Sequence, residues 1–133
     1  MDNENKRDII TVNKILRYIS ELNRIIEKFD VKSYNDLENE YIALSSITQT
    51  ITNINELKKL INVEILNKML IFNKIKTNAT RNIASHDYDS ISPYAVYNVM
   101  TKLISDDNIN EMEAILNDIT KENDESECAA TKQ

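Results

Sequence analysis

One stretch of eight residues holds side chains that could carry out acid–base chemistry on a phosphate. It reads Arg81-Asn82-Ile83-Ala84-Ser85-His86-Asp87-Tyr88 and contains the only histidine of the 133-residue chain. Arg81 is one of four arginines in a chain that has twelve lysines. A guanidinium can bind two phosphate oxygens, an imidazole exchanges a proton near neutral pH, and a phenol offers a hydroxyl group. These residue types make the stretch the candidate site.

Helical geometry brings part of this set together. Each residue of a helix turns by about 100°, so Asn82 and His86, four residues apart, share a face. Arg81 lies five residues before His86 and about 140° round the helix by the same geometry. The long arginine side chain reaches the imidazole if the helix loosens near its end. The set is therefore compatible with one site without being forced into it.

Metal-independent cleavage of RNA is a reaction that these residue types fit. The 2′-hydroxyl must lose a proton to attack the adjacent phosphorus, and a histidine with a pKa near ~6.5 suits that transfer. The five-coordinate phosphorus gains negative charge, which the guanidinium of Arg81 can bind with two N–H groups. Asn82 could orient the phosphate or the imidazole of His86. The expected product carries a 2′,3′-cyclic phosphate.

The same residues also have structural interpretations. A histidine near a helix end is often a partner of the helix dipole, where its cationic form is favourable. Arg81 could pair with Glu64 or with Asp89, and Tyr88 could lie at the rim of the core. Spacing alone leaves these alternatives to catalysis by His86 open.

Composition predicts an all-α protein. The chain has no glycine and a single proline, Pro93, whereas the tight turns of compact β folds depend on glycine and proline. The absence of glycine excludes a P-loop and a dinucleotide-binding fingerprint. Cys128 is the only cysteine, so a disulfide within one chain is excluded, as is a metal site built on cysteines or histidines. We therefore expect no metal and no cofactor.

Apolar residues at steps of three and four predict an antiparallel bundle of four or five helices. The first helix is expected over about 8–29. A capping box at Ser33-Tyr34-Asn35-Asp36 opens a second helix to about 54, whose polar middle, Ser45–Thr50, fits either close packing or the wall of a cleft. A short turn or bend is expected over 55–62, then a long helix over 63–86. Ser92-Pro93 begins another helix, and a break near 105–108 precedes the last.

Charge divides the chain into two parts. Residues 105–133 contain nine acidic residues and two lysines, whereas residues 1–104 contain 13 acidic and 14 basic residues. The net charge of −6 therefore does not argue against RNA binding by the body. Residues 58–82 contain six bases and one acid, Glu64. We predict a helical domain over 1–120 and a disordered acidic tail over 121–133.

Location follows from what the chain lacks. The first eight residues, Met1 to Asp8, are mostly charged and contain no apolar core of signal-peptide length. No apolar run approaches the ~20 residues that cross a bilayer. The sequence therefore predicts a cytoplasmic protein with no membrane partner.

The spacing Arg81-X4-His86-X-Tyr88 resembles the motif of HepT-like toxins of the HEPN (higher eukaryotes and prokaryotes nucleotide-binding) superfamily. The context from Thr80 to Ile91 is similar to the end of a helix in that family, and a helix rich in valine and an aromatic residue follows, with Ala95-Val96-Tyr97. The expected order of helices agrees over roughly residues 8–120. One departure is Thr48-Gln49-Thr50, where many relatives have Gly-Glu-Ala.

The resemblance implies a homodimeric helical bundle whose two motifs meet in a shared cleft. It implies a metal-independent endoribonuclease that acts as the toxin of a toxin–antitoxin pair. Arg81 would bind the phosphate, His86 would act as acid and base, and Asn82 would assist. The implied partner is an MNT-type nucleotidyltransferase, which neutralises the toxin by transferring AMP to Tyr88.

Two other functions are compatible with the sequence. One is a HEPN-type bundle that no longer cuts RNA and serves as a binding or dimerisation module beside a nucleotidyltransferase. The other is a helical adaptor whose acidic tail docks to a basic partner. An intact set of Arg81, Asn82, His86 and Tyr88 favours the ribonuclease over the module that no longer cuts RNA, and removal of residues 121–133 would test the adaptor.

Overall fold

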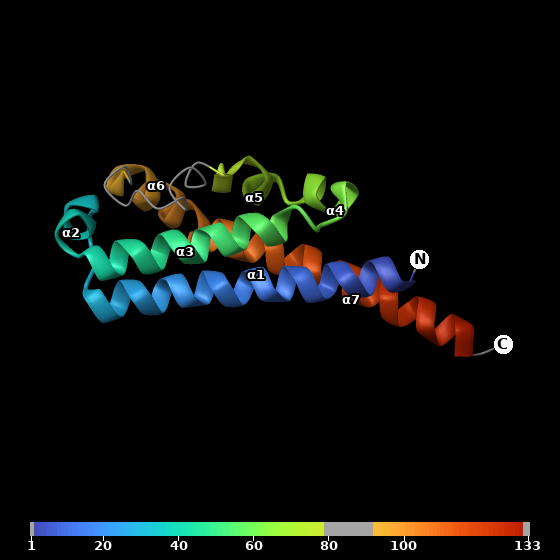
Figure 1. The fold of residues 1–133 in the computed structure, drawn as a ribbon. Helices are drawn as coiled ribbons and strands as arrows, with labels where there is room; N and C mark the ends of the chain where they lie inside the picture. The colour runs from blue at the N-terminus through green and yellow to red at the C-terminus, as the bar shows by residue number, and fades with distance from the viewer. Residues whose placement is uncertain (1, 79–91, 132–133) are drawn as a thin grey trace.

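The computed structural model describes residues 2–78 and 92–131, and over these residues the chain is all-helical. The expected all-α class is therefore confirmed. Seven helices are described (Figure 1): α1 (Asp2–Phe29), α2 (Tyr34–Asn39), α3 (Tyr41–Lys58), α4 (Val63–Lys68), α5 (Leu70–Lys74), α6 (Pro93–Leu103) and α7 (Asp106–Thr131). They outnumber the expected four or five because two of the predicted helices are each divided.

Three long helices form the frame of the fold. Helix α1 packs against α3 and against α7, and each of these two runs antiparallel to it (Figure 1). The short helices α2 and α6 pack against each other, and α5 packs against α7. Within the described ranges, no helix is both long and apolar enough to cross a membrane.

The core forms where the apolar periodicity predicts it. Val12, Ile15 and Leu22 of α1 are completely buried, as are Ile47 and Ile51 of α3. Burying one such side chain stabilises the fold by about 1.5–3 kcal/mol before conformational entropy is counted. Burial of these side chains therefore stabilises the packing of α1 and α3 in the core.

The predicted helix over about 34–54 is interrupted at Glu40. The backbone of Glu40 has φ −126° and ψ 87°, outside the helical region. This break lets α2 lie on α6 while α3 lies on α1. Leu37 before the break and Ala43 after it are both fully buried, so burial on two surfaces offsets the lost helical hydrogen bonds. Helix α3 also continues to Lys58, beyond the predicted end.

The prediction of one helix over 63–86 is wrong for its described part. Helix α4 ends at Met69, whose φ of −85° and ψ of 75° are not helical. Helix α5 ends at Ile75, which is extended with φ −71° and ψ 123°. Ile65, Met69, Phe72 and Ile75 are nevertheless buried, as predicted. The apolar period thus located the core correctly although the helix is broken, and residues 79–86 lie outside the described residues.

Helix α7 continues to Thr131, although its composition predicts disorder from residue 121 onward. The segment has no proline or glycine to end the helix. Asn123 is also 93% buried (7% exposed), so packing extends past the predicted boundary. The charged residues Lys121, Glu122 and Asp124 of this helical segment are exposed.

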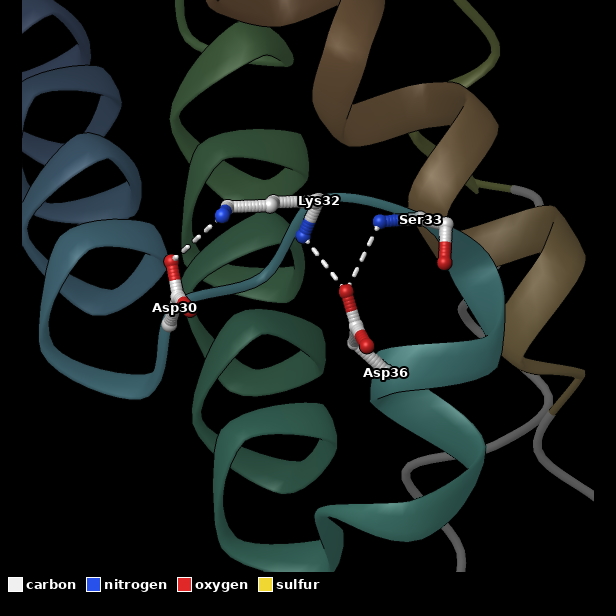
Figure 2. A network of polar contacts seen from close by, with 4 residues as sticks. All are labelled: Asp30, Lys32, Ser33 and Asp36. Atoms are coloured by element: carbon white, nitrogen blue, oxygen red, sulfur yellow. Dashed lines mark hydrogen bonds and ion pairs between the residues drawn. The ribbon is translucent and has the colours of Figure 1, made fainter.

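In the connection from α1 to α2, an aspartate takes the position that glycine often occupies at a helix end. Asp30 has φ 52°, the left-handed conformation that usually falls to glycine. Asp30 N donates to Glu27 O and Val31 N donates to Ile26 O at 3.0 Å, the two bonds of a Schellman motif. The predicted capping box then begins α2, with Asp36 Oδ2 accepting hydrogen bonds from the backbone N of Ser33 and Lys32 (Figure 2).

Candidate functional site

The four predicted site residues are Arg81, Asn82, His86 and Tyr88. All of them lie in residues 79–91, outside the described residues, so their mutual arrangement stays a prediction. The alternative pairing of Arg81 with Asp89 lies there too. The structure does describe the residues that lead into this segment and those that follow it.

A buried hydrogen bond fixes the chain just before the motif. Thr77 is 2% exposed and Asn55 of α3 is 6% exposed. The Thr77 hydroxyl donates to Asn55 Oδ1 at 2.7 Å. This bond between two buried side chains connects the chain at Thr77, four residues before Arg81, to α3.

Lys58, at the end of α3, closes the C-terminal end of α5. Its ammonium donates to the carbonyl oxygens of Phe72 (3.3 Å), Asn73 (3.3 Å) and Ile75 (2.9 Å). It also lies 5.1 Å from the centroid of the Phe72 ring. A helix end leaves carbonyls without intrahelical partners, and here one cation binds three carbonyls, two of α5 and that of Ile75 just after it. Burial lowers the pKa of Lys58 below its ordinary value, because partial removal from water disfavours the charged form.

This role changes the interpretation of the basic run over residues 58–82. Lys58 is committed to backbone carbonyls, and Lys59 pairs with Glu56 at 3.1 Å. Lys68, Lys74 and Lys76 are exposed. The positive charge available to a ligand before residue 79 is therefore smaller than the sequence count suggests. The sequence carried no signal for Lys58, because a half-buried lysine and a solvated one look alike in a lysine-rich run.

The N-terminal end of α5 is held by a second helix. Glu111 Oε1 of α7 accepts a hydrogen bond from the backbone N of Ile71 at 2.7 Å. A carboxylate at a helix N-terminus satisfies a free N–H group and interacts favourably with the helix dipole. The five-residue helix α5 is thus bound at one end by α7 and at the other by α3. Neither contact has a signature in the local sequence.

The chain after the motif begins with the predicted helix start. Ser92 Oγ accepts from Ala95 N at 3.2 Å, and Pro93 occupies the first turn of α6. The exposed ring of Tyr94 meets that of Tyr34 edge to face, with centroids 5.7 Å apart. The described chain is therefore anchored on the far side of the motif too.

The polar middle of α3 serves both purposes that its sequence left open. Thr48 is buried, and its hydroxyl donates to Leu44 O at 2.7 Å, which satisfies the side chain within the helix. Ser45, Ser46 and Gln49 instead line a surface hollow against α1. Thr48 therefore lies on the packed face of α3, whereas Ser45, Ser46 and Gln49 lie on the face that borders the hollow.

The described residues frame the candidate site without forming a catalytic cluster of their own. Over 2–78 and 92–131, no group of three or more His, Cys, Asp or Glu side chains is placed to hold a metal ion. Comparisons with protein-family models, with curated proteins and with solved structures found no match to this chain.

Proposed function

We propose that the chain is a HepT-like ribonuclease toxin of the HEPN superfamily, acting in the cytoplasm as a homodimer. Arg81 binds the phosphate that is attacked, and His86 takes the proton of the 2′-hydroxyl as that oxygen attacks phosphorus. The P–O5′ bond breaks, and the 5′-oxygen takes up a proton and leaves as a hydroxyl. Asn82 orients the phosphate or the imidazole. The reaction needs no metal, because the guanidinium takes the charge that develops on phosphorus.

The observation that carries this proposal is the spacing Arg81-X4-His86-X-Tyr88 in an all-helical chain. Two further observations support it. The chain is anchored before the motif by the Asn55–Thr77 hydrogen bond, and after it α6 packs on α2. Anchored ends suit a segment whose side chains must converge, since catalytic geometry tolerates only small displacements.

Neutralisation follows from the same site. Transfer of AMP from ATP to the Tyr88 hydroxyl by a nucleotidyltransferase would break the bond between the α- and β-phosphates, release pyrophosphate and place a phosphate two residues from His86. That phosphate would occupy Arg81, and the purine would fill the space that RNA needs. Tyr88 is thus the point at which the partner acts, and a Tyr88→Phe variant should stay active in the presence of that partner and ATP.

The first experiment compares the purified chain with two variants, His86→Ala and Arg81→Ala, on a short single-stranded RNA in EDTA. Loss of a general acid–base typically lowers the rate by about 10²–10⁴-fold, and loss of a transition-state donor by about 10²–10³-fold. Arg7→Ala, which removes an exposed arginine from α1, is the matched control. Mass spectrometry should find a 2′,3′-cyclic phosphate on the product.

Circular dichroism of each variant separates loss of chemistry from loss of fold. Equal cleavage by the native chain and both motif variants would show that the motif is scaffold. No cleavage by any of them, together with an intact dimer, would favour the non-catalytic binding module. A monomer in light scattering would remove the shared cleft from the proposal.

A further inference from the structure

A groove runs between α1 and α3 on the surface of the molecule. Two hollows, of about 590 and 530 Å³, lie along these two helices and share Glu21 in their linings. Every described residue that lines either hollow belongs to α1 or to α3. The two hollows therefore form one groove, defined here as the α1–α3 groove.

One wall of the α1–α3 groove is cationic. Lys14, Arg17, Arg24 and Lys28 line it together with a single acid, Glu21. These five positions recur at steps of three and four residues, so they follow one face of α1. From the first lysine to the last, the row spans about 21 Å at 1.5 Å per residue. A single phosphate or nucleotide is shorter than this row, so an extended polyanion fits it better.

The other wall and the floor differ from the cationic wall. On α3, Ser46, Gln49 and Asn53 supply hydroxyl and amide groups, and Glu56, which pairs with Lys59 at 3.1 Å, adds one carboxylate. The half-buried side chains of Tyr18 and Leu57 add an aromatic ring and an apolar surface. Cations for phosphates, amides for polar edges and a ring for stacking are the groups that bind single-stranded nucleic acid.

The largest group of acidic residues lies away from this groove, whose linings hold two acids: Glu56, and Glu21, which pairs with Arg24 at 3.5 Å. Helix α7 contains nine acidic residues and one lysine, Lys121, and it contributes no residue to either lining. The rest of the chain therefore carries a net charge of about +2 despite the total of −6. A polyanion would meet a favourable charge at the groove and repulsion at α7.

We propose that the α1–α3 groove binds the phosphodiester backbone of single-stranded RNA. This inference rests on the proposed function in that it supplies a path for the substrate outside the motif. Packed helices lie about 8–10 Å apart, so a groove between two of them admits one strand more readily than a duplex. Arg17 and Arg24 bind phosphates, and the ring of Tyr18 stacks on a base.

Salt dependence gives the inference a magnitude. Each phosphate neutralised on a single strand contributes about −0.7 to the slope of log K against log salt. Four contacts give a slope of about −2.8, and binding then weakens about 50-fold between 50 and 200 mM salt. Replacing two cations leaves a slope of about −1.4, and the same change in salt then weakens binding only about 7-fold.

The test measures fluorescence anisotropy of a labelled, non-self-complementary 12-nucleotide RNA at several salt concentrations. All proteins carry His86→Ala so that the probe is not cut. The groove variant is Arg17→Gln with Arg24→Gln. The control variant, Lys32→Gln with Lys121→Gln, removes the same charge from two exposed lysines outside the groove. The inference expects a halved slope for the groove variant and an unchanged slope for the control.

Other outcomes separate this inference from the proposed function. Equal slopes and affinities for both variants, or no binding by the parent chain, overturn the groove as an RNA site, whether or not the chain cleaves RNA. Binding lost only in the groove variant, from a native chain that never cleaves, keeps the groove and rejects the ribonuclease. If poly-glutamate of equal charge displaces RNA as well as unlabelled RNA does, the groove is only a general polyanion surface and the inference fails.

Discussion

Replacing Lys58 with methionine tests whether one ammonium group holds α5 in place. Methionine keeps an unbranched apolar stem of similar length but removes the charge and all three donors. The carbonyls of Phe72, Asn73 and Ile75 then lose the side-chain partner that they share. We expect the variant to fold, because the buried side chains around α5 are unchanged, but with lower stability.

The size of the loss follows from the geometry around Lys58. Only the bond to Ile75 O, at 2.9 Å, has an ordinary length, and the other two are 3.3 Å long. One hydrogen bond from a charged donor contributes about 1.5–3 kcal/mol net. The cation–π contact adds about 0.5–1 kcal/mol, and the cost of removing the ammonium from water offsets part of the gain. We therefore expect a net loss of about 2 kcal/mol.

Urea unfolding followed by circular dichroism measures this loss. With a slope of about 2 kcal/mol per molar urea, the midpoint of the Lys58→Met variant falls by about 1 M. Lys59→Met is the control, because its exposed ion pair with Glu56 contributes at most about 1 kcal/mol. Equal midpoints for the two variants would refute the role assigned to Lys58.

The difference in free energy of unfolding between the native chain and the Lys58→Met variant should also depend on pH, with a definite sign. Burial lowers the pKa of Lys58 in the native state below 10.5. Between that lowered value and 10.5, the unfolded chain binds more protons than the native chain at this site. The stability of the native chain relative to Lys58→Met therefore rises as the pH rises through this window, and it falls as the pH is lowered through it. If the free energy of unfolding of the native chain relative to Lys58→Met stays constant up to pH 10.5, the ammonium is not buried as described.

Three further changes test other parts of the frame, each by the midpoint of urea unfolding. Glu111→Ala leaves the backbone N of Ile71 without its 2.7 Å partner and should cost about 1–2 kcal/mol, whereas Glu111→Gln keeps an acceptor and should cost less. Equal losses would mean that the contact is incidental. A double-mutant cycle of Asn55→Ala and Thr77→Val should show a coupling of about 1 kcal/mol, and additive losses would exclude a direct bond. Asp30→Gly should stabilise the chain by about 0.5–1 kcal/mol because φ 52° no longer strains a side chain, and a destabilised variant would argue against that strain.

The sequence predicted the parts of the fold that depend on local periodicity. The buried positions of α1 and α3, the capping box at Ser33, the start of α6 at Ser92 and the break before α7 were all readable from residue type and spacing. Each of these features is encoded within four or five neighbouring residues. That is why a single sequence was enough to place them.

The breaks within predicted helices could not be read in the same way. Nothing in the residues around Met69 differs from a helical interior, and Met69 itself is a good helix former. Glu111, 42 residues after Met69 in the chain, accepts a hydrogen bond from the backbone N of Ile71 just after this break, and Lys58, 11 residues before Met69, binds carbonyls at the following end of α5. Such breaks involve contacts between residues that are distant in the sequence, so local helix propensity does not predict them. The α1–α3 groove could not be predicted from the sequence for the same reason, because its two walls come together only in the folded chain.

The absence of glycine explains why so many distant side chains act on the backbone. A chain with glycine can end a helix locally with a left-handed residue. Here Asp30 takes that conformation at the end of α1, and three other helix ends use side chains: Asn62 and Ser92 cap the starts of α4 and α6 locally, and Lys58 of α3 closes α5. Helix ends that depend on a partner from another helix form only when the tertiary structure forms. The path of the chain toward residue 79 is therefore tied to the core, and a variant that loosens α5 should lower activity at the motif even though it leaves every motif residue in place.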